Sequence, residues 1–243
     1  MRNSCRCQEQ TEQFFYDEAF RLSRSFRHNG HYTLCTYDSE GRVTEEISPK
    51  ADGLKSITRT TYADARFYDN RPATVAEYIV NAAGTEVHIR TTTHVYELTE
   101  AVEKVTTTVT AGGSSQQQVS ISETFTTPAD NPYAAGKEKF SQDINGVQTW
   151  HEYTATTEHG AVHKHTAITK VNGELVPAQS HKTESFFAAN DTVIFEAESI
   201  WDGTQWLLLD TTAYEYDEQQ RIIKTTRGNG RFSTTEWMCC GRL

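Results

Sequence analysis

Apolar and polar residues alternate, imperfectly, along most of residues 53–215, and short groups of turn-forming residues divide the pattern into runs. From Asn145 onward these groups are about 12 to 18 residues apart, which leaves room for strands of about 8 to 14 residues. Long strands joined by tight turns favour an antiparallel meander of long hairpins, and we predict an all-β fold. The predicted turns are at residues 81–84, 112–115, 145–146, 159–160, 172–173, 190–191 and 202–203.

Two segments lie outside this pattern. Residues 1–15 show no strand period, and we predict an irregular N-terminal segment there. Residues 130–136 contain Pro132 and Gly136, which favours a loop that interrupts the meander without ending the domain. Residues 16–243 are therefore predicted to form a single β-repeat domain.

An internal repeat joins the two ends of this domain. Residues 16–43 align with residues 216–243 without a gap, and both copies carry Tyr-Asp and, later, a Gly-Arg pair. A fixed spacing of this kind is the mark that repeat architectures leave in a sequence. The residues that we assign to the repeat motif are Tyr16, Asp17, Arg21, Gly30, Tyr37, Asp38, Gly41, Arg42, Tyr216, Asp217, Arg221, Gly230, Trp237, Gly241 and Arg242.

The motif has a mechanical interpretation. Residues 38–41 fit a type I turn that ends in a left-handed residue, because an Asp side chain can accept backbone N–H groups and Gly takes a positive φ without strain. Gly30 and Gly230 follow asparagine, in the strongest short hairpin signal. Phe20 and Gln220 stand at the glycine position, and each would cost roughly 1 kcal/mol in a left-handed conformation.

The motif resembles that of the RHS or YD-repeat family, whose signature is Tyr-Asp-x-x-Gly-Arg-Leu with a glycine midway and a period near 21 residues. The resemblance covers residues 16–43 and 216–243. It implies a curved antiparallel sheet, part of a shell or a spiral ribbon, that encloses a C-terminal effector in the toxin-associated bacterial members.

A structural role follows from the same resemblance. It implies a non-catalytic scaffold that is secreted or on the cell surface, with further repeats, neighbouring shell elements, an enclosed toxin effector or a glycan as partners. The chain would be a fragment, because Gly241 and Arg242 would open a strand whose continuation is missing.

Exposed aromatic residues suggest an alternative function, a carbohydrate-binding or protein-binding sheet. With a turn at residues 202–203, Trp201 and Trp206 are predicted to be diagonal neighbours on one face, and Trp150 lies two strands or more away. Three indole rings on one sheet could stack on sugars, or they could pack against one another or against the next turn of the spiral.

The segment from Trp150 to Thr166 carries the densest group of ionisable side chains. A two-residue turn at residues 159–160 would place Glu152, His163 and His165 on one face, where they could approach a divalent metal. The next turn would then set Lys182 beside His163 and His181 on the opposite face. A neighbouring cation disfavours a metal, so we expect solvated strand histidines.

No other residue group indicates catalysis. Carboxylates are plentiful, but no pair among them is singled out as a glycosidase would require, and a Gly-x-Ser-x-Gly elbow is absent. The five cysteines lack the two-residue gap of a zinc knuckle. We therefore predict no enzyme activity, no cofactor and no metal. The cysteines are Cys5, Cys7, Cys35, Cys239 and Cys240.

Composition narrows the choice of partners. The formal net charge of −10 argues against binding to nucleic acid or to an anionic membrane, because both need a basic face. No run approaches the roughly 20 apolar residues of a membrane-spanning helix, so membrane insertion is not expected. With 36% hydrophobic and 11% aromatic residues, the chain is expected to fold around a thin core.

Overall fold

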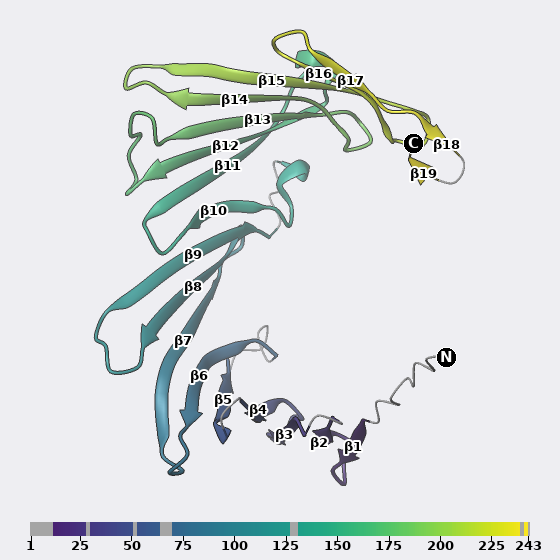
Figure 1. Cartoon of the computed structure of the whole chain (residues 1–243). Coiled ribbons are helices and arrows are strands. Elements are labelled where there is room, and N and C mark those ends of the chain that lie inside the picture. Colours follow the sequence, from purple (N-terminus) through teal and green to yellow (C-terminus); the bar gives the residue numbers. More distant parts are fainter. Residues whose placement is uncertain are drawn as a thin grey trace, which may run out of the picture. The chain divides into compact units, whose positions relative to one another are not determined.

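The computed structural model describes residues 12–27, 30–50, 53–63, 70–126, 131–238 and 241–242. In this part of the chain, seventeen strands belong to one sheet and two short strands form a second (Figure 1). The all-β prediction is confirmed. The strands are β1 (Gln13–Tyr16), β2 (Leu22–Phe26), β3 (Tyr32–Tyr37), β4 (Val43–Pro49), β5 (Lys55–Tyr62), β6 (Pro72–Val80), β7 (Glu86–Leu98), β8 (Val102–Ala111), β9 (Gln117–Phe125), β10 (Glu138–Gln142), β11 (Val147–Ala155), β12 (His163–Val171), β13 (His181–Phe187), β14 (Val193–Trp201), β15 (Trp206–Tyr216), β16 (Ile222–Arg227), β17 (Phe232–Thr234), β18 (Trp237–Met238) and β19 (Gly241–Arg242).

Each hairpin pairs a strand with its neighbour in the sequence. The antiparallel registers run from β1 to β7 and from β9 to β17, so the predicted meander is confirmed. The predicted loop at residues 130–136 contains a short 3₁₀ helix, η2 (Pro132–Ala134). Contacts divide the chain into two compact units, residues 1–95 with 107–119 and residues 96–106 with 120–243.

The buried core is thin, as the composition indicates. Most strand residues are half-buried, because the alternation of apolar and polar residues places polar groups on both faces. Such a sheet must draw much of its stability from local hydrogen bonds and turns rather than from a deep apolar layer. The buried apolar residues among those described are Ile57, Ala134, Phe140, Tyr153, Ala161 and Phe186.

One turn conformation recurs along the chain. The backbone N–H of a first residue donates to the carbonyl of the residue four positions later, and the fourth residue of the turn, with a positive φ, donates back to the first. This is the three-residue hairpin loop in which a left-handed residue forms a bulge after a type I turn. The first residues of these turns are Asp17, Arg27, Asp38, Asn81, Asp143, Ala188, Asp217 and Arg227.

The left-handed position of this turn is not always glycine. Gly30, Gly41 and Gly230 have φ values of 78°, 84° and 80°, as predicted from their place in the motif. Phe20 and Gln220 take φ values of 60° and 61°, which confirms that the turn imposes the left-handed conformation on side chains that resist it.

Replacing Gln220 with glycine is expected to stabilise the protein by about 0.5 kcal/mol. The substitution removes the left-handed strain of roughly 1 kcal/mol, and the greater freedom of glycine in the unfolded chain offsets part of that gain. The measurement is urea unfolding. Gln219→Gly, in the same turn but without a positive φ, is the control and should destabilise; a loss of stability in Gln220→Gly would contradict the strain.

Candidate functional site

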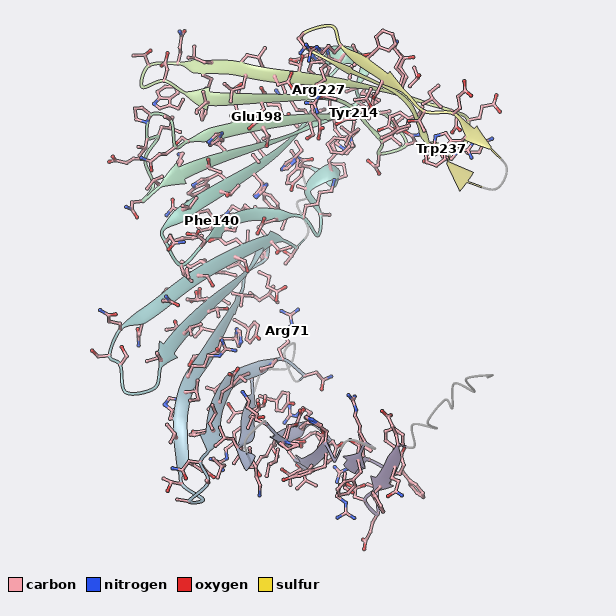
Figure 2. The ribbon with its side chains drawn as sticks, in the orientation of Figure 1. Arg71, Phe140, Glu198, Tyr214, Arg227 and Trp237 are labelled. Atoms are coloured by element: carbon pink, nitrogen blue, oxygen red, sulfur yellow. The ribbon has the colours of Figure 1, made fainter. Side chains whose placement is uncertain are left out.

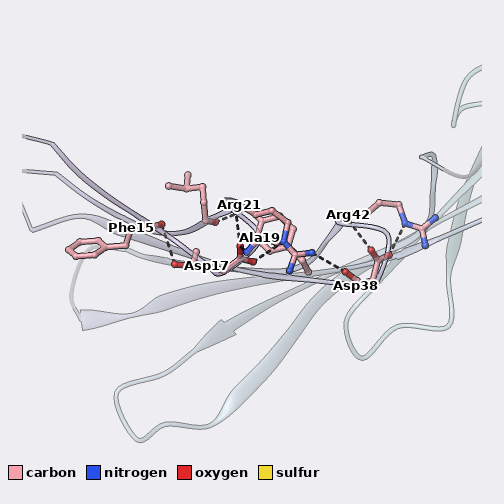
Figure 3. Close-up of polar contacts among 9 residues, drawn as sticks. Phe15, Asp17, Ala19, Arg21, Asp38 and Arg42 are labelled. Carbon is pink, nitrogen blue, oxygen red and sulfur yellow. Dashed lines mark hydrogen bonds and ion pairs between the residues drawn. The ribbon is translucent and has the colours of Figure 1, made fainter.

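The motif turn is held together by its aspartate and arginine. The Asp17 carboxylate accepts hydrogen bonds from the backbone N–H groups of Ala19 and Arg21, both at 2.9 Å, and from Arg21 Nε at 2.8 Å (Figure 3). Arg21 Nη1 also donates to the carbonyl of Asp38 at 3.2 Å, in the next motif turn. One side chain therefore closes its own turn and ties it to the following one.

The other motif turns repeat this arrangement. Arg42 Nε donates to Asp38 at 2.7 Å, and Arg221 Nε donates to Asp217 at 2.7 Å. The hydrogen bond from the Arg221 side chain, followed by that from its backbone N–H, lowers the pKa of Asp217. The backbone N–H of Arg21 is the main cause that lowers the pKa of Asp17. These carboxylates are thus held in the ionised form.

An aromatic ring completes the motif. The Arg21 guanidinium lies 4.6 Å from the centre of the Tyr37 ring, and the Tyr37 hydroxyl donates to the carbonyl of Leu22 at 2.7 Å. The ring is thus held at its face by a cation and at its hydroxyl by the backbone of the residue after that cation. We call this three-part contact the clasp.

The clasp recurs in both units. In the first, Arg42 lies 4.6 Å from the Tyr62 ring, and the Tyr62 hydroxyl donates to the carbonyl of Val43 at 2.8 Å. In the second, Arg221 lies 5.4 Å from the Trp237 ring, and Trp237 Nε1 donates to the carbonyl of Ile222 at 2.9 Å. Trp237, in β18 (Figure 2), therefore does the work of the motif tyrosine.

A further clasp lies in the central region, which carries no visible motif. Lys137 Nζ lies 5.2 Å from the centre of the Tyr153 ring, and the Tyr153 hydroxyl donates to the carbonyl of Glu138 at 3.1 Å. Lys137 follows the left-handed Gly136, as Arg42 follows Gly41. The sequence thus holds two signals for this clasp: the glycine before Lys137, and a spacing of 15 residues between the ring and the carbonyl that it reaches, as at Tyr37.

The turn that begins at Ala188 forms half of a clasp. The Tyr216 hydroxyl donates to the carbonyl of Val193 at 2.5 Å, but Thr192 stands where the other turns carry a cation. Sequence reasoning assigned Tyr216 to the motif and missed Tyr62, Lys137 and Tyr153. Gly241 and Arg242 form β19, of whose side chains nothing is described.

Tyr37→Phe is expected to lower the free energy of unfolding by about 1 kcal/mol. The substitution removes the hydroxyl and leaves the half-buried Leu22 carbonyl without that donor, while the ring stays beneath Arg21. Urea unfolding measures the loss. The matched control is Tyr16→Phe, at the same motif position with 60% exposure, which should change stability by less than about 0.3 kcal/mol. Equal losses in both variants would contradict the role of the clasp.

The structure brings Trp201 and Trp206 into direct contact. They are direct cross-strand partners in β14 and β15, not diagonal neighbours as predicted. Their rings pack edge to face, with 5.3 Å between the ring centres. Both are half-buried. Trp150, in β11, is separate: its ring packs 4.6 Å from Phe140 and is 44% exposed.

The loop between β11 and β12 corrects the predicted placement of Glu152 on one face with His163 and His165. It spans residues 156–162 and contains the 3₁₀ helix η3 (Glu158–Gly160), so it is longer than the two-residue turn that we predicted. Glu152 pairs with Thr166 and Tyr153 pairs with His165, which shifts the register by one residue. Glu152 therefore lies on the opposite face from His163 and His165.

The loop between β12 and β13 is also longer than predicted and spans residues 172–180. His163 pairs with Phe187, and Lys182 pairs with Ile168. Lys182 is therefore not beside His163, and His181 lies on the same face as His163 rather than the opposite one.

His163 and His165 are not the solvated side chains that we expected. His163 is 1% exposed, and its ring is stacked between Tyr133 at 4.4 Å and Phe187 at 4.7 Å. A hydrogen bond of 2.9 Å joins His151 Nδ1 and His165 Nε2, and Glu138 Oε2 lies 3.0 Å from His151 Nε2.

The side chains of His163 and His165 resist protonation. Burial, helped by His151 and Lys137, lowers the pKa of His165 to about 4. Burial and Lys137 also lower the pKa of His163, against the opposing effect of Asp191. His163 and His165 are therefore neutral at pH 7, and His165 stacks on the Tyr153 ring of the clasp.

The carboxylates of β14 and β15 are largely engaged in contacts with other side chains. The Tyr214 hydroxyl donates to Glu196 at 2.6 Å, and Arg227 Nη1 donates to Asp210 at 2.9 Å; Figure 2 labels Tyr214 and Arg227. Burial and the bond to Glu196 raise the pKa of Tyr214 to about 12. A polar hollow lies over these strands, and its lining carries more negative than positive charge, because four carboxylates and one cation line it. They are Glu184, Glu196, Glu198, Asp210 and Arg227.

The part of the chain that the structure describes offers neither a cluster of metal ligands nor a membrane-spanning helix. It holds no group of three or more His, Cys, Asp or Glu side chains placed to bind a metal ion. None of its helices is long and apolar enough to cross a membrane. Cys35 is a half-buried free thiol whose pKa burial raises, while the other four cysteines lie outside the described residues.

Comparison with known proteins gives structural neighbours only. No family model and no curated protein matches the sequence. Among solved structures, the chain is similar to a crystal structure of TcdB2-TccC3, with 13% identity and a TM-score of 0.32 over 96% of this chain and 18% of that one. It is also similar to the Photorhabdus luminescens Tc holotoxin pore with a TccC3 variant, with 14% identity and a TM-score of 0.32 over 96% of this chain and 13% of that one. The chain thus spans less than a fifth of the length of either neighbour.

Proposed function

We propose that this chain is a non-catalytic structural scaffold of the RHS or YD-repeat type, part of a shell or an extended surface protein. The observation that carries the proposal is the recurrence of one turn and one clasp along the chain. Among the described residues, the same left-handed turn closes eight hairpins, and the first residues of these turns range from Asp17 to Arg227. Repetition of a local structural contact, rather than convergence of side chains on one cleft, is what a repeat scaffold requires.

The contacts of the motif arginines support this role. Arg21, Arg42 and Arg221 each bind the aspartate of their own turn and lie over a ring of a later strand. A sheet with polar groups on both faces gains its specificity from such contacts, because its apolar core is too thin to define the register alone. In this proposal the ionisable residues are structural, and no reaction is assigned to them.

The proposal extends to partners and location. A shell wall would meet further repeats, neighbouring shell elements or an enclosed toxin effector, and the protein would be secreted or on the cell surface. These expectations rest on the resemblance of residues 16–43 and 216–243 to the YD-repeat motif.

Hydrogen exchange of the purified chain tests the scaffold directly. We expect slow exchange in the hairpins of both units, and the same pattern after adding divalent metal ions or a panel of glycans. Protection that a metal ion induces only around Glu196, Glu198 and Asp210 would replace the scaffold with a metal-binding or catalytic site.

A carbohydrate-binding sheet is the second candidate, favoured by the 44% exposure of Trp150 with Lys170 Nζ 5.6 Å from its ring. A glycan array distinguishes the two functions. Saturable binding that Trp150→Ala abolishes would favour the binding module. Trp206→Ala, in the half-buried pair of Trp201 and Trp206, serves as the matched variant. The scaffold proposal predicts no tryptophan-dependent binding.

A further inference from the structure

Tyr16 occupies the motif position of the clasp but takes part in none. It aligns with Tyr216 and stands 21 residues before Tyr37. Tyr37, Tyr62 and Tyr216 are half-buried, with hydroxyls that donate to backbone carbonyls. Tyr16 is 60% exposed, and no cation or carbonyl of the described residues meets it.

The strand that carries Tyr16 is apolar and open. All four residues of β1 are exposed, and its register joins it to β2. Phe14 is 51% and Phe15 is 40% exposed, and Phe20, in the turn that follows, is 89% exposed. An aromatic strand edge of this kind invites pairing with another strand.

The geometry of the other clasps shows what Tyr16 lacks. In the clasps of Tyr37 and Tyr62 the ring lies at the end of a strand, as the ring of Tyr16 does, and its hydroxyl reaches the first residue of the preceding strand, where the cation of that strand's turn lies over the ring. The missing partner of Tyr16 is therefore a strand on the outer side of β1, which begins just after a left-handed turn residue and an arginine or lysine.

The local charge fits a cationic turn. Glu18, two residues after Tyr16 in the sequence, is exposed, and Asp17 is already bound to Arg21. Glu12, at the other end of β1, is 46% exposed and lies 3.4 Å from Arg27. An approaching arginine would thus find a ring face and a free carboxylate together.

We propose that Tyr16 and the outer edge of β1 form a docking surface for a β-hairpin whose turn carries an arginine or lysine followed by a free backbone carbonyl. This inference rests on the proposed scaffold function and names the chemistry of its neighbour. The hairpin adds a strand to β1 and places its cation over the Tyr16 ring. Its carbonyl accepts a hydrogen bond from the Tyr16 hydroxyl.

The probe is a cyclised peptide that copies residues 13–26, with phenylalanine at the Tyr16 position so that it does not bind itself. It presents the arginine and carbonyl that Tyr37 meets within the chain. Titrated into the full chain by calorimetry, it should bind saturably at one site. A matched peptide with citrulline for the arginine keeps the hydrogen-bonding shape without the charge and should bind about fivefold more weakly.

Variants of the chain locate the site. Tyr16→Phe should weaken peptide binding about fivefold without changing the fold, because only a hydroxyl is lost. Phe232→Ala, which removes a ring that is 67% exposed elsewhere, should leave binding unchanged. Absence of saturable binding up to about 1 mM peptide, equal binding of the citrulline peptide, or equal weakening by Phe232→Ala would each overturn the proposal. None of these results alters hydrogen exchange of the free chain, so the scaffold proposal is tested separately.

Discussion

Gly112→Ala is expected to lower the free energy of unfolding by about 3 kcal/mol or more. Gly112 follows β8, and its N–H donates to the carbonyl of Ile89 in β7 at 2.6 Å. A Cβ at this position would lie 1.9 Å from the His88 carbonyl oxygen and 2.7 Å from its carbon. These are backbone atoms of a paired strand, so the clash is relieved only by breaking the contact between the two strands.

The neighbouring glycine separates this clash from other effects of alanine. Gly113 has a φ of 74°, and a Cβ there would meet no atom within 4 Å, so Gly113→Ala should cost about 1 kcal/mol from backbone strain alone. Urea unfolding of both variants provides the comparison. If Gly112→Ala costs no more than Gly113→Ala, β7 and β8 do not approach each other as described.

Lowering the pH from 7 to 4 is expected to reduce the free energy of unfolding by about 2 kcal/mol through the buried histidines. The pKa of His165 is depressed from 6.5 to about 4 by burial, His151 and Lys137, and the pKa of His163 is depressed as well. The unfolded chain therefore binds more protons than the folded chain between these values. The contribution of these histidines to the free energy of unfolding is fully present above pH 6.5, and it is lost as the pH falls toward 4.

The size of the stability loss and the pH range over which it occurs distinguish the histidines from the motif aspartates. A full shift of this size would give roughly 3 kcal/mol, and we expect less because His165 is partly open to solvent. The motif aspartates, whose pKa values are lowered by their arginines, lose their contribution only at lower pH, as they protonate.

Urea midpoints measured between pH 7 and pH 4 provide the test. His165→Gln should flatten the dependence of stability on pH, whereas His181→Gln, at a side chain that is 42% exposed, should not. A wild-type stability that is constant over this range would contradict the burial of neutral imidazoles.

The hairpins and their turns could be predicted from the sequence because the signals are local. Gly30, Gly41 and Gly230 mark positive φ values through the residue type itself. Phe20 and Gln220 became recognisable only through the internal repeat, which placed them at a glycine position. The motif aspartates likewise form the turn bonds that their spacing from the backbone N–H groups predicts.

The cross-strand contacts could not be predicted because they depend on register. The loop at residues 156–162 is longer than its turn signal, and the shift of one residue moved Glu152 to the other face. A loop of four residues, 202–205, in place of the predicted two-residue turn made Trp201 and Trp206 direct partners.

The central clasp was missed for a related reason. The backbone N–H of Phe125 donates to the carbonyl of Lys137, 12 residues later, whereas that of Asp17 donates to the carbonyl of Arg21, only four residues later. Lys137 is also a lysine where the motif has an arginine, so neither residue type nor spacing identified it. Its ring partner, Tyr153, is defined by the pairing of β10 with β11, which only the folded sheet provides.

A double-mutant cycle between Lys137 and Tyr153 tests most directly whether one repeated contact organises the whole chain. Unfolding free energies are measured for Lys137→Met, Tyr153→Leu and the double variant, and the same cycle is made with Arg21 and Tyr37. We predict a coupling of about 0.5 to 1 kcal/mol in both cycles, since a cation lies over the ring in both places. A coupling at Arg21 and Tyr37 with none at Lys137 and Tyr153 would show that the central hairpins are built on another principle.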